Sequence, residues 1–514
     1  MQDRRLGRIW LAATLLQVGV LVLFSALYVF VIDGQRYWGV SDDIYISACY
    51  ARSIAHGAGA VWYPGTPPVE GFSNPLWTLL LALIHRLPFF REEYLGLFVL
   101  VVQVVVLACT CRLALRVLRR LLVLSGAPPE LTRMRLAGVL VLSLGWSALA
   151  YWQAEGFEIG LVLLFALWAL QLALEPRPGA ARPFVIGALC GLSLWTRMDG
   201  VLACAPALIL LACGPGFSPR QLGWCALGAL PLAAALFLAR HAVFGEWLPN
   251  TYWLKLSGWP LFERLERGVQ SNAPLLPAFA LAWAGMALSR VRRALGAALL
   301  PVLALLSTAT LTVAYSCHNG GDSWNLRLGY DRFSAPGSLL LGLALVLVLL
   351  RVGAAPRERL ATALGTCVIA LSPLLLDPSL SYTVKLCSGK FERGERRFLE
   401  FGHAFELCSK PGAKTALGAA GAIVYVSHRG ACDYLGKCDP WVARQPVNHP
   451  EMTSGHNKRY EAAIFERDKP EFSRLQPPEP FRADYRECRS AGQAIWVRRD
   501  SVNALWDKLE IMSK

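Results

Sequence analysis

The stretch GVSDDIYISACYARSIAHGAGAVWYPGTPPVEGFSNPLW, residues 39–77, is the longest polar interruption of the chain before its C-terminal region. It follows an uncharged apolar run at residues 9–32, which is long enough to cross ~30 Å of hydrocarbon as a helix. The stretch carries two adjacent acids, Asp42 and Asp43, where a membrane surface should lie, and Ser41 before them suits a helix N-cap. We therefore interpret residues 39–77 as a loop of a membrane protein that presents two carboxylates at the bilayer surface.

The composition is that of a polytopic membrane protein. Hydrophobic residues make up 55% of the 514 residues and charged residues 17%, which is too apolar for an ordinary soluble protein. The first apolar run is longer than the core of a signal peptide and lacks a small-residue cleavage site, so we expect an uncleaved anchor. The net charge of +15 would suit nucleic acid, but the bases lie mostly between apolar runs, where they fit membrane topology better. We expect a lipid bilayer as partner and no nucleic acid.

The arginines set the expected topology. Arg4, Arg5 and Arg8 precede the first apolar run, which places the N-terminus inside and the loop 33–77 outside. Residues 75–87 are too short to span comfortably, and we expect an interfacial or partly sunk helix there. We expect about 11 spans, at residues 9–32, 94–115, 136–151, 159–174, 184–196, 201–213, 222–239, 273–288, 294–315, 337–350 and 361–376.

Residues 184–213 allow two interpretations. They form either two short spans broken at residues 197–200 or one long helix. A single helix would reverse every later loop and place Arg290, Arg292 and Arg293 outside, against the positive-inside rule. We therefore expect the break.

A change in composition near residue 377 marks a second domain. Residues 377–514 are rich in charged residues and contain no apolar run able to span a membrane. The expected fold is a polytopic α-helical membrane domain over residues 1–376, with its N-terminus inside, and an extracytoplasmic α/β soluble domain over residues 377–514. Residues 421–427 (GAIVYVS) indicate a buried strand, and residues 493–497 indicate another.

Cysteines in the C-terminal domain should face an oxidising compartment, so we expect disulfides there. The cysteines of this domain are Cys387, Cys408, Cys432, Cys438 and Cys488. The spacing of Cys432 and Cys438 allows a small closed loop, and Cys387 and Cys408 are further candidates. Because the number is odd, one cysteine would pair with Cys317 or stay free.

Residues 39–77 resemble the first extracytoplasmic loop of the GT-C class of membrane-embedded glycosyltransferases, which use polyprenyl-phosphate sugars. The likeness is to the bacterial branch that includes the terminal arabinofuranosyltransferase of mycobacterial cell walls. The shared pattern is an acid pair, a short helix ending in Gly, an aromatic-Pro-Gly turn, then Glu-Gly, a short residue and Asn before an apolar helix. In this chain Gly57, Glu70 and Asn74 fill the corresponding positions, and the resemblance implies Glu70 and Asn74 as substrate contacts.

The resemblance implies an inverting glycosyltransferase with a GT-C-like fold, embedded in the plasma (bacterial inner) membrane. The donor would be a polyprenyl-phosphate hexose or pentose, and the acceptor a glycan, lipid or protein of the cell envelope. Transfer would take place on the outer, periplasmic face, where the C-terminal domain is also expected.

Asp42 and Asp43 are the candidate catalytic residues. Sugar transfer needs a carboxylate that takes the proton of the acceptor hydroxyl, and such a base can drive displacement with inversion at the anomeric carbon. Adjacent helical residues diverge by ~100°, so the two acids cannot do the same job. The resemblance implies Asp42 as the base and Asp43 as a support or a contact to a divalent cation, Mg²⁺ or Mn²⁺; no other cofactor is indicated. The alternative is that both acids only favour a helix N-terminus.

Arg197 and Asp199 in TRMDG are charged residues between apolar spans, a costly placement that is usually functional. The resemblance implies that they contact the substrate, and the alternative is an ion pair that closes a helical turn.

Glu155 and Glu158 resemble the acids of the second outer loop of the class, with Glu158 as a substrate contact. The alternative for both glutamates is a solvated position in a loop.

Two later stretches supply the remaining candidates. WLPNTYWLK, residues 247–255, resembles the branch and implies Asn250 and Lys255 as sugar or phosphate contacts. The alternative is an interfacial aromatic belt with a snorkelling lysine. HNGGDSWNLRLGYDRFSAP resembles the Gly-Gly-Asp and Arg-Phe elements of the branch and implies Asp322 and Arg332, although the gap between these two is longer here. A guanidinium suits the geometry of a phosphate.

A transporter or a flippase for lipid-linked sugars is the main alternative function, and it would also explain the apolar spans. Charges at the middle of the bilayer and two repeated halves are expected of such proteins. In the expected topology of this chain the polar candidates gather at one face, and the sequence shows no internal repeat. This arrangement favours chemistry at the membrane surface.

Overall fold

The structure is a computed structural model that describes residues 2–126, 138, 152–175, 179–214, 217–322, 331–352 and 394–512. The chain falls into two compact units. Unit 1 comprises residues 1–24, 100–236 and 261–388, and unit 2 comprises residues 25–99, 237–260 and 389–514. The boundary predicted at residue 376, the spans predicted at residues 136–151 and 361–376, and Cys387 lie outside the described residues.

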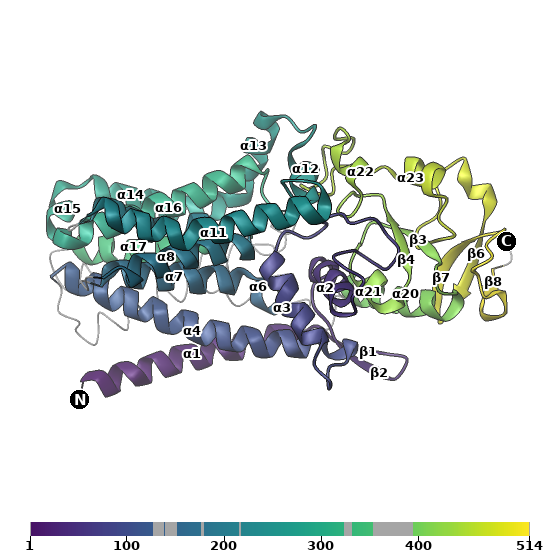
Figure 1. Cartoon of the computed structure of the whole chain (residues 1–514), viewed down its shortest axis with the longest axis horizontal. Helices are drawn as coiled ribbons and strands as arrows, with labels where there is room; N and C mark the ends of the chain where they lie inside the picture. The colour runs from purple at the N-terminus through teal and green to yellow at the C-terminus, as the bar shows by residue number, and fades with distance from the viewer. Residues whose placement is uncertain are drawn as a thin grey trace. The chain divides into compact units, whose positions relative to one another are not determined.

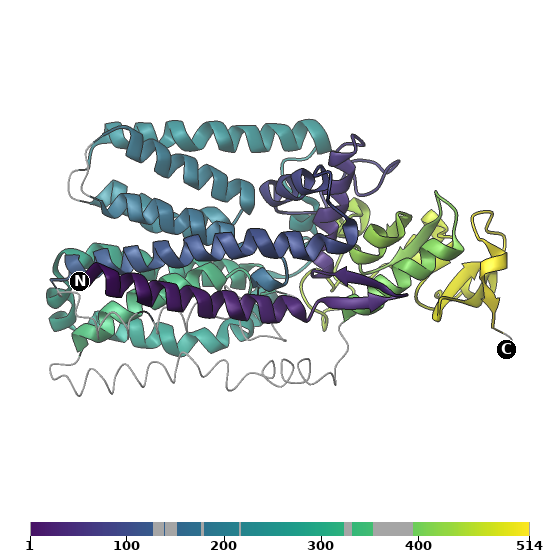
Figure 2. The same cartoon turned by 90° about the horizontal axis from the view of Figure 1, so that it is seen from below.

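Unit 1 is helical, and its long helices run side by side in both views (Figures 1 and 2). The helices that contribute residues to it are α1 (Gln2–Ala26), α4 (Leu95–Leu124), α6 (Trp152–Ala154), α7 (Ile159–Leu174), α8 (Ala181–Thr196), α9 (Gly200–Ala203), α10 (Ala205–Cys213), α11 (Pro219–Phe244), α13 (Leu261–Asn272), η3 (Ala273–Leu275), α14 (Leu276–Ala287), α15 (Ser289–Leu295), η4 (Gly296–Ala298), α16 (Leu299–His318) and α17 (Ala335–Val352).

Within the described part of the chain, 3 helical segments are long and apolar enough to cross a membrane. They are residues 92–124, 219–244 and 289–318. Shorter apolar helices, such as α7, α8 and α17, accompany them. These helices indicate a membrane protein, while the predicted number of spans and their orientation stay predictions.

The predicted break near Arg197 is confirmed. Helix α8 ends at Thr196, Arg197 has extended backbone angles (φ −157°, ψ 140°), and α9 begins at Gly200. The alternative of one continuous helix over residues 184–213 is therefore wrong. Because the helix is interrupted here, Arg197 lies at the C-terminal end of α8 and Asp199 at the N-terminal end of α9.

The prediction that the first apolar run is one helix to residue 32 is wrong at its C-terminal end. Helix α1 ends at Ala26, and β1 (Val29–Ile32) pairs antiparallel with β2 (Gln35–Trp38). Val, Phe and Ile favour strands, and the connecting Asp33 and Gly34 both have positive φ, 48° and 75°. An Asp-Gly pair with these angles is the preferred two-residue hairpin turn. The prediction failed because residues 29–32 are as apolar as the helix before them, so hydropathy alone does not mark where the helix ends.

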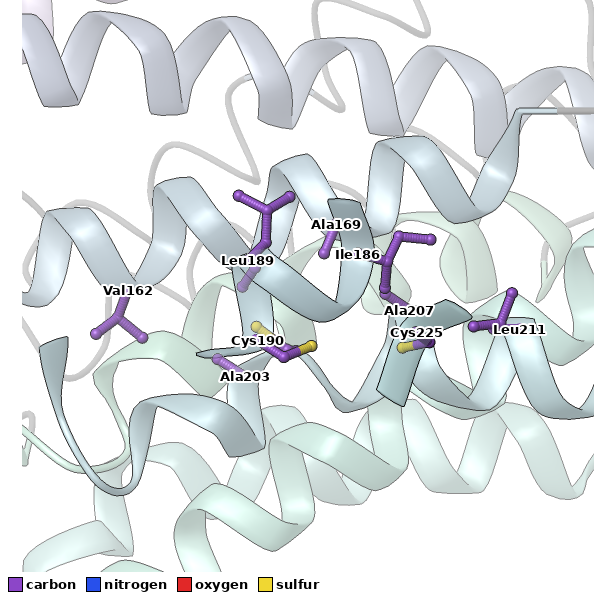
Figure 3. Packing of buried hydrophobic residues seen from close by; sticks show 11 residues of the cluster. Val162, Ala169, Ile186, Leu189, Cys190, Ala203, Ala207, Leu211 and Cys225 are labelled. Carbon is purple, nitrogen blue, oxygen red and sulfur yellow. The ribbon is translucent and has the colours of Figure 1, made fainter. Parts of the chain in front are cut away.

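One buried cluster of unit 1 is made of small and medium side chains from α7, α8, α9, α10 and α11 (Figure 3). Its members are Val162, Ala166, Ala169, Ile186, Leu189, Cys190, Ala203, Cys204, Ala207, Leu211 and Cys225. Small residues at helix interfaces let backbones approach closely, which is the usual basis of helix association in membranes. Helices α8 and α11 use a glycine each for this purpose: a Cβ at Gly187 would lie 1.9 Å from the carbonyl oxygen of Cys225, and one at Gly228 would lie 2.1 Å from that of Phe184.

Unit 2 contains the hairpin β1–β2, helices of the first loop, and the described C-terminal residues. Its remaining elements are α2 (Asp42–Ala55), α3 (Pro75–His85), η1 (Glu92–Tyr94), α12 (Asn250–Leu256), α20 (Gly394–Cys408), β3 (Lys414–Leu417), α21 (Ala422–Ser427), β4 (Gly430–Asp433), α22 (Pro440–Arg444), α23 (Glu461–Asp468), β5 (Phe472–Ser473), η6 (Phe481–Asp484), β6 (Tyr485–Ser490), β7 (Gln493–Arg498), η7 (Trp506–Lys508) and β8 (Glu510–Ile511). Helices α2 and α3 pack together, as do α20 and α21 (Figure 1).

The C-terminal strands form a six-stranded mixed sheet in the order β4-β3-β5-β7-β6-β8. Strand β3 runs parallel to β4 and β5, and β7 runs antiparallel to β5 and β6. Ala416 of β3, Cys432 of β4 and Tyr485 of β6 belong to one buried cluster, which also includes Tyr434, Val442 and Phe465. The strand predicted at residues 493–497 is confirmed as β7.

The strand predicted at residues 421–427 is wrong, because residues 422–427 form helix α21. Nearly every side chain of this segment is buried, and a short run that is apolar on all sides fits a buried strand and a buried helix equally well.

The predicted disulfides are absent from the described residues, where Cys408, Cys432, Cys438 and Cys488 are all free thiols. The Sγ of Cys438 faces the hydroxyl of Tyr50 at 3.8 Å, and Cys432 belongs to β4.

We predict that Gly187→Ala lowers the free energy of unfolding by about 1–3 kcal/mol, because the added methyl group has to displace the backbone of α11. The matched control is Gly223→Ala in the same helix pair, where a Cβ meets nothing within 4 Å. Thermal unfolding of the detergent-solubilised protein compares the two variants. Equal midpoints would show that α8 and α11 are not in close contact.

Candidate active site

The acid pair opens helix α2 in unit 2. Ser41 occupies the predicted N-cap position, but its side chain makes no capping hydrogen bond. Asp42 is buried with 4% of its surface exposed, and the side chain of Asp43 is 16% exposed. The two carboxylates therefore lie in different surroundings, as expected for neighbours on a helix.

Asp42 faces the start of helix α21. One carboxylate oxygen, Oδ1, accepts a hydrogen bond from the backbone N–H of Ala422 at 2.8 Å. Gly421 is required beside it, because a Cβ there would lie 1.9 Å from the carbonyl oxygen of Asp42. Burial raises the pKa of Asp42 to about 6, while the ammonium of Lys437 and the N–H of Ala422 act in the opposite direction. A carboxylate with this pKa can accept a proton and release it near neutral pH.

Asp43 pairs with Lys437 from the C-terminal part of the chain. The Nζ of Lys437 lies 2.7 Å from Oδ1 of Asp43, and the lysine side chain is only 12% exposed. The two residues are 394 positions apart in the sequence. None of the motifs described above includes Lys437, so the sequence did not point to it.

The segment Asp433–Cys438, which we name the lysine loop, is held rigidly. The carboxylate of Asp433 accepts backbone hydrogen bonds from Leu435, Gly436 and Cys438, at 2.9, 3.1 and 2.7 Å. The side-chain amide of Asn250 donates to the carbonyl oxygens of Gly436 and Lys437 at 2.9 and 3.0 Å. The loop that carries the ammonium is therefore held by its own residue Asp433 and by Asn250 of α12.

The other candidates of unit 2 make contacts that hold the loops around the acid pair. Glu70 forms a buried ion pair with Arg240, in which Nη2 donates to Oε1 at 3.1 Å, and its carbonyl oxygen accepts from the N–H of Asn250 at 3.1 Å. Asn74 accepts hydrogen bonds from two hydroxyl groups, one in α2 and one in α3, at 2.9 and 3.2 Å. Lys255 is half-buried in α12. Substrate contacts by these residues stay a prediction.

Unit 1 brings the remaining candidates together around two arginines. Arg197 is 5% exposed, and its guanidinium donates to both oxygens of Asp199 at 3.0 and 3.1 Å and to Glu158 at 2.9 Å. Glu158 is buried as well, with 1% of its surface exposed, and so is Glu155 with 5%. The two glutamates are thus buried and not solvated loop acids. Arg197 forms an ion pair with Asp199, as in the structural alternative given above, and a second one with Glu158.

Arg332 pairs with Asp322 across the gap that separates them in the sequence. Its Nε lies 3.0 Å from Oδ2 of Asp322, and its Nη2 donates to Oδ1 at 3.2 Å. The guanidinium carbon lies 4.5 Å from the centre of the Phe157 ring and 5.9 Å from that of Phe333, whose ring also lies 5.3 Å from the guanidinium carbon of Arg197. Both arginines therefore share one aromatic neighbour.

Asp331 organises the segment that carries these residues, and the sequence comparison did not single it out. It is fully buried and accepts hydrogen bonds from the hydroxyl groups of Ser271 and Ser316 at 3.0 and 2.7 Å. It also accepts from the backbone N–H groups of Asp322 and Phe333 at 2.6 and 2.7 Å. In the sequence, its position directly before Arg332 and Phe333 was the one feature that could have pointed to Asp331.

This chain is similar to a known protein in its fold, while its sequence matches none of the family models or curated proteins compared. Neither the models of known protein families nor the curated proteins match this chain. A solved structure of ArnT from Cupriavidus metallidurans, bound to undecaprenyl phosphate, is similar with a TM-score of 0.55 and 11% sequence identity, over 96% of this chain and 98% of ArnT. The chain has an ArnT-like fold. At this level of identity the likeness is one of fold.

We predict that Arg197→Ala lowers the free energy of unfolding by about 3–5 kcal/mol, because it removes the buried guanidinium that pairs with the carboxylates of Glu158 and Asp199. Arg290→Ala in α15 is the matched control, since Arg290 is exposed. The measurement is thermal or denaturant unfolding of the purified protein in detergent. An Arg197→Ala protein as stable as the control would show that the ion pairs with Asp199 and Glu158 do not support the fold.

Proposed function

We propose that this protein is an inverting glycosyltransferase that moves a sugar from a polyprenyl-phosphate donor to an acceptor of the cell envelope. The observation that carries the proposal is a buried carboxylate, Asp42, whose pKa is raised to about 6, in a chain with an ArnT-like fold. General bases work best when their pKa lies near the operating pH. The structure of ArnT holds undecaprenyl phosphate, which supports a donor carried on a lipid phosphate.

In the proposed mechanism Asp42 takes the proton from an acceptor hydroxyl. The hydroxyl oxygen then attacks the anomeric carbon of the donor sugar from the face opposite the phosphate. The bond between the anomeric carbon and the phosphate oxygen breaks, and polyprenyl phosphate leaves with the electron pair. The product has inverted configuration, and Asp42 afterwards releases its proton to water.

Asp42 suits the role of base better than Asp43 does. The ammonium of Lys437 already occupies Oδ1 of Asp43 at 2.7 Å, so this oxygen is engaged in an ion pair. Burial favours the protonated form of Asp42. The two environments separate the roles of the acids, as the adjacent positions on the helix require.

Arg197, Arg332 and Lys255 are our candidates for contacts to the leaving phosphate. A guanidinium can hold a phosphate with two parallel hydrogen bonds. In the structure each arginine already contacts carboxylates, so a phosphate would share these side chains with Glu158, Asp199 and Asp322. The transferred sugar in this proposal is a hexose or a pentose.

Asp42→Asn should reduce turnover by about 100- to 10,000-fold, because it removes a positioned base. For the wild type, turnover should rise with pH up to about pH 6 and level off above it, since the base must be deprotonated to act. Transfer to a fixed acceptor, measured between pH 4.5 and 8.5, gives both results. Asp507→Asn, at an exposed position of the same unit, is the matched control.

Near-normal turnover of Asp42→Asn would move the role of base to Asp43. If Asp42→Asn and Asp43→Asn both keep wild-type turnover, the acid-base mechanism is wrong. That outcome would instead favour the transporter or flippase.

A further inference from the structure

The acid pair of α2 has a cation of its own, supplied by the C-terminal part of the chain. The Nζ of Lys437 contacts Asp43 at 2.7 Å, and the charges of Asp42 and Asp433 also act on it. Among these groups the lysine carries the positive charge and the three aspartates carry the negative ones. Arg474 is a further cation whose charge interacts with Asp42.

The ammonium of Lys437 is firmly charged. Its side chain is 12% exposed, and an unpaired ammonium is costly to bury. Burial lowers the pKa of Lys437, but the carboxylates of Asp43 and Asp42 outweigh this effect and the pKa is raised. The pair with Asp43 is therefore what keeps the lysine in place.

The position of Lys437 is fixed by its neighbours on both sides. Gly436 and Lys437 offer their carbonyl oxygens to Asn250, and the N–H of Cys438 donates to Asp433. Cys438 also packs closely on the first loop, since a Cβ at Gly71 would lie 2.5 Å from its Sγ. The backbone is thus held at residues 436, 437 and 438, and the largely buried side chain ends in the ion pair with Asp43.

A divalent cation does not fit the acid pair while Lys437 is present. Mg²⁺ requires about six oxygen ligands near 2.1 Å in octahedral geometry. Oδ1 of Asp43 faces an ammonium at 2.7 Å, and Oδ1 of Asp42 receives a backbone N–H. Over the residues that the structure describes, no three or more His, Cys, Asp or Glu side chains come together in a way that could hold a metal ion. An ion beside Asp43 would also be repelled by the lysine.

We propose that Lys437 takes the place of a divalent metal at the acid pair, and that it is a positioning residue which neutralises and fixes Asp43 during sugar transfer. This inference rests on the proposed function. A lipid-phosphate donor is itself anionic, so two bare carboxylates would repel it, and the ammonium removes one of these charges at the distance of direct contact. The C-terminal segment thereby becomes part of the active site.

The test uses the purified full-length protein, with sugar transfer measured at saturating donor with and without EDTA. Wild-type turnover should change less than about twofold when EDTA is present. Lys437→Met, which keeps the packing volume, should lower kcat by about 10- to 100-fold, the range typical of residues that orient a functional group. Lys437→Arg should recover most of the loss because it restores the charge. Lys508→Met, at an exposed position, is the matched control.

Loss of wild-type turnover in EDTA that Mg²⁺ or Mn²⁺ restores would overturn the proposal, and so would a Lys437→Met protein with wild-type kcat. A second variant, Lys437→Met with Asp43→Asn, removes both charges of the pair and guards against a folding defect. If that variant folds like the wild type and also transfers sugar at the wild-type rate, the pair has no part in transfer.

Manganese binding gives a readout that does not depend on activity. Electron paramagnetic resonance of the wild type should show no Mn²⁺ bound with a Kd below ~1 mM, a range that covers ordinary protein sites for such ions. Binding in the wild type that disappears in Asp43→Asn would overturn the role of Lys437. A wild-type protein that transfers no sugar but also binds no Mn²⁺ would instead contradict the proposed function and support the assignment of the cation.

Discussion

The constraint on which the packing around α2 depends is the cost of removing its first two carboxylates from water, completely for Asp42 and largely for Asp43. A buried acid must be hydrogen-bonded, paired or protonated. Asp42 receives an N–H from Ala422 and has a pKa raised to about 6, whereas Asp43 is paired with Lys437. Segments far apart in the sequence meet there because each supplies a partner that the acids require. The first loop and the C-terminal residues are therefore in contact at these two carboxylates.

The same physics shapes the charged group of unit 1. Arg197 and Arg332 are buried, and the carboxylates of Glu158, Asp199 and Asp322 surround them. Two positive charges face three negative ones, so this group does not have the excess of positive charge that is typical of a phosphate site. The contacts describe a structural ion-pair group first, and contacts to a donor phosphate would be added to it.

Local signals predicted the features that depend on neighbouring residues. The break after Thr196, the helix that begins at Asp42 and strand β7 follow from charges, acids at a helix start and alternating residues. The hairpin after α1 and helix α21 were missed, because short apolar runs have no period that separates helix from strand. Lys437 could not be predicted, since its partner lies 394 positions away and only the fold brings them together.

The most direct test of the central claim is the choice of donor by the purified full-length protein. The protein would be given a panel of polyprenyl-phosphate sugars and the corresponding sugar nucleotides, with cell-envelope acceptors, and the anomeric configuration of the product would be determined by NMR. We expect transfer from at least one lipid-phosphate sugar, none from the nucleotides, and inverted configuration in the product. Transfer from a sugar nucleotide, or a product with retained configuration, would contradict that claim.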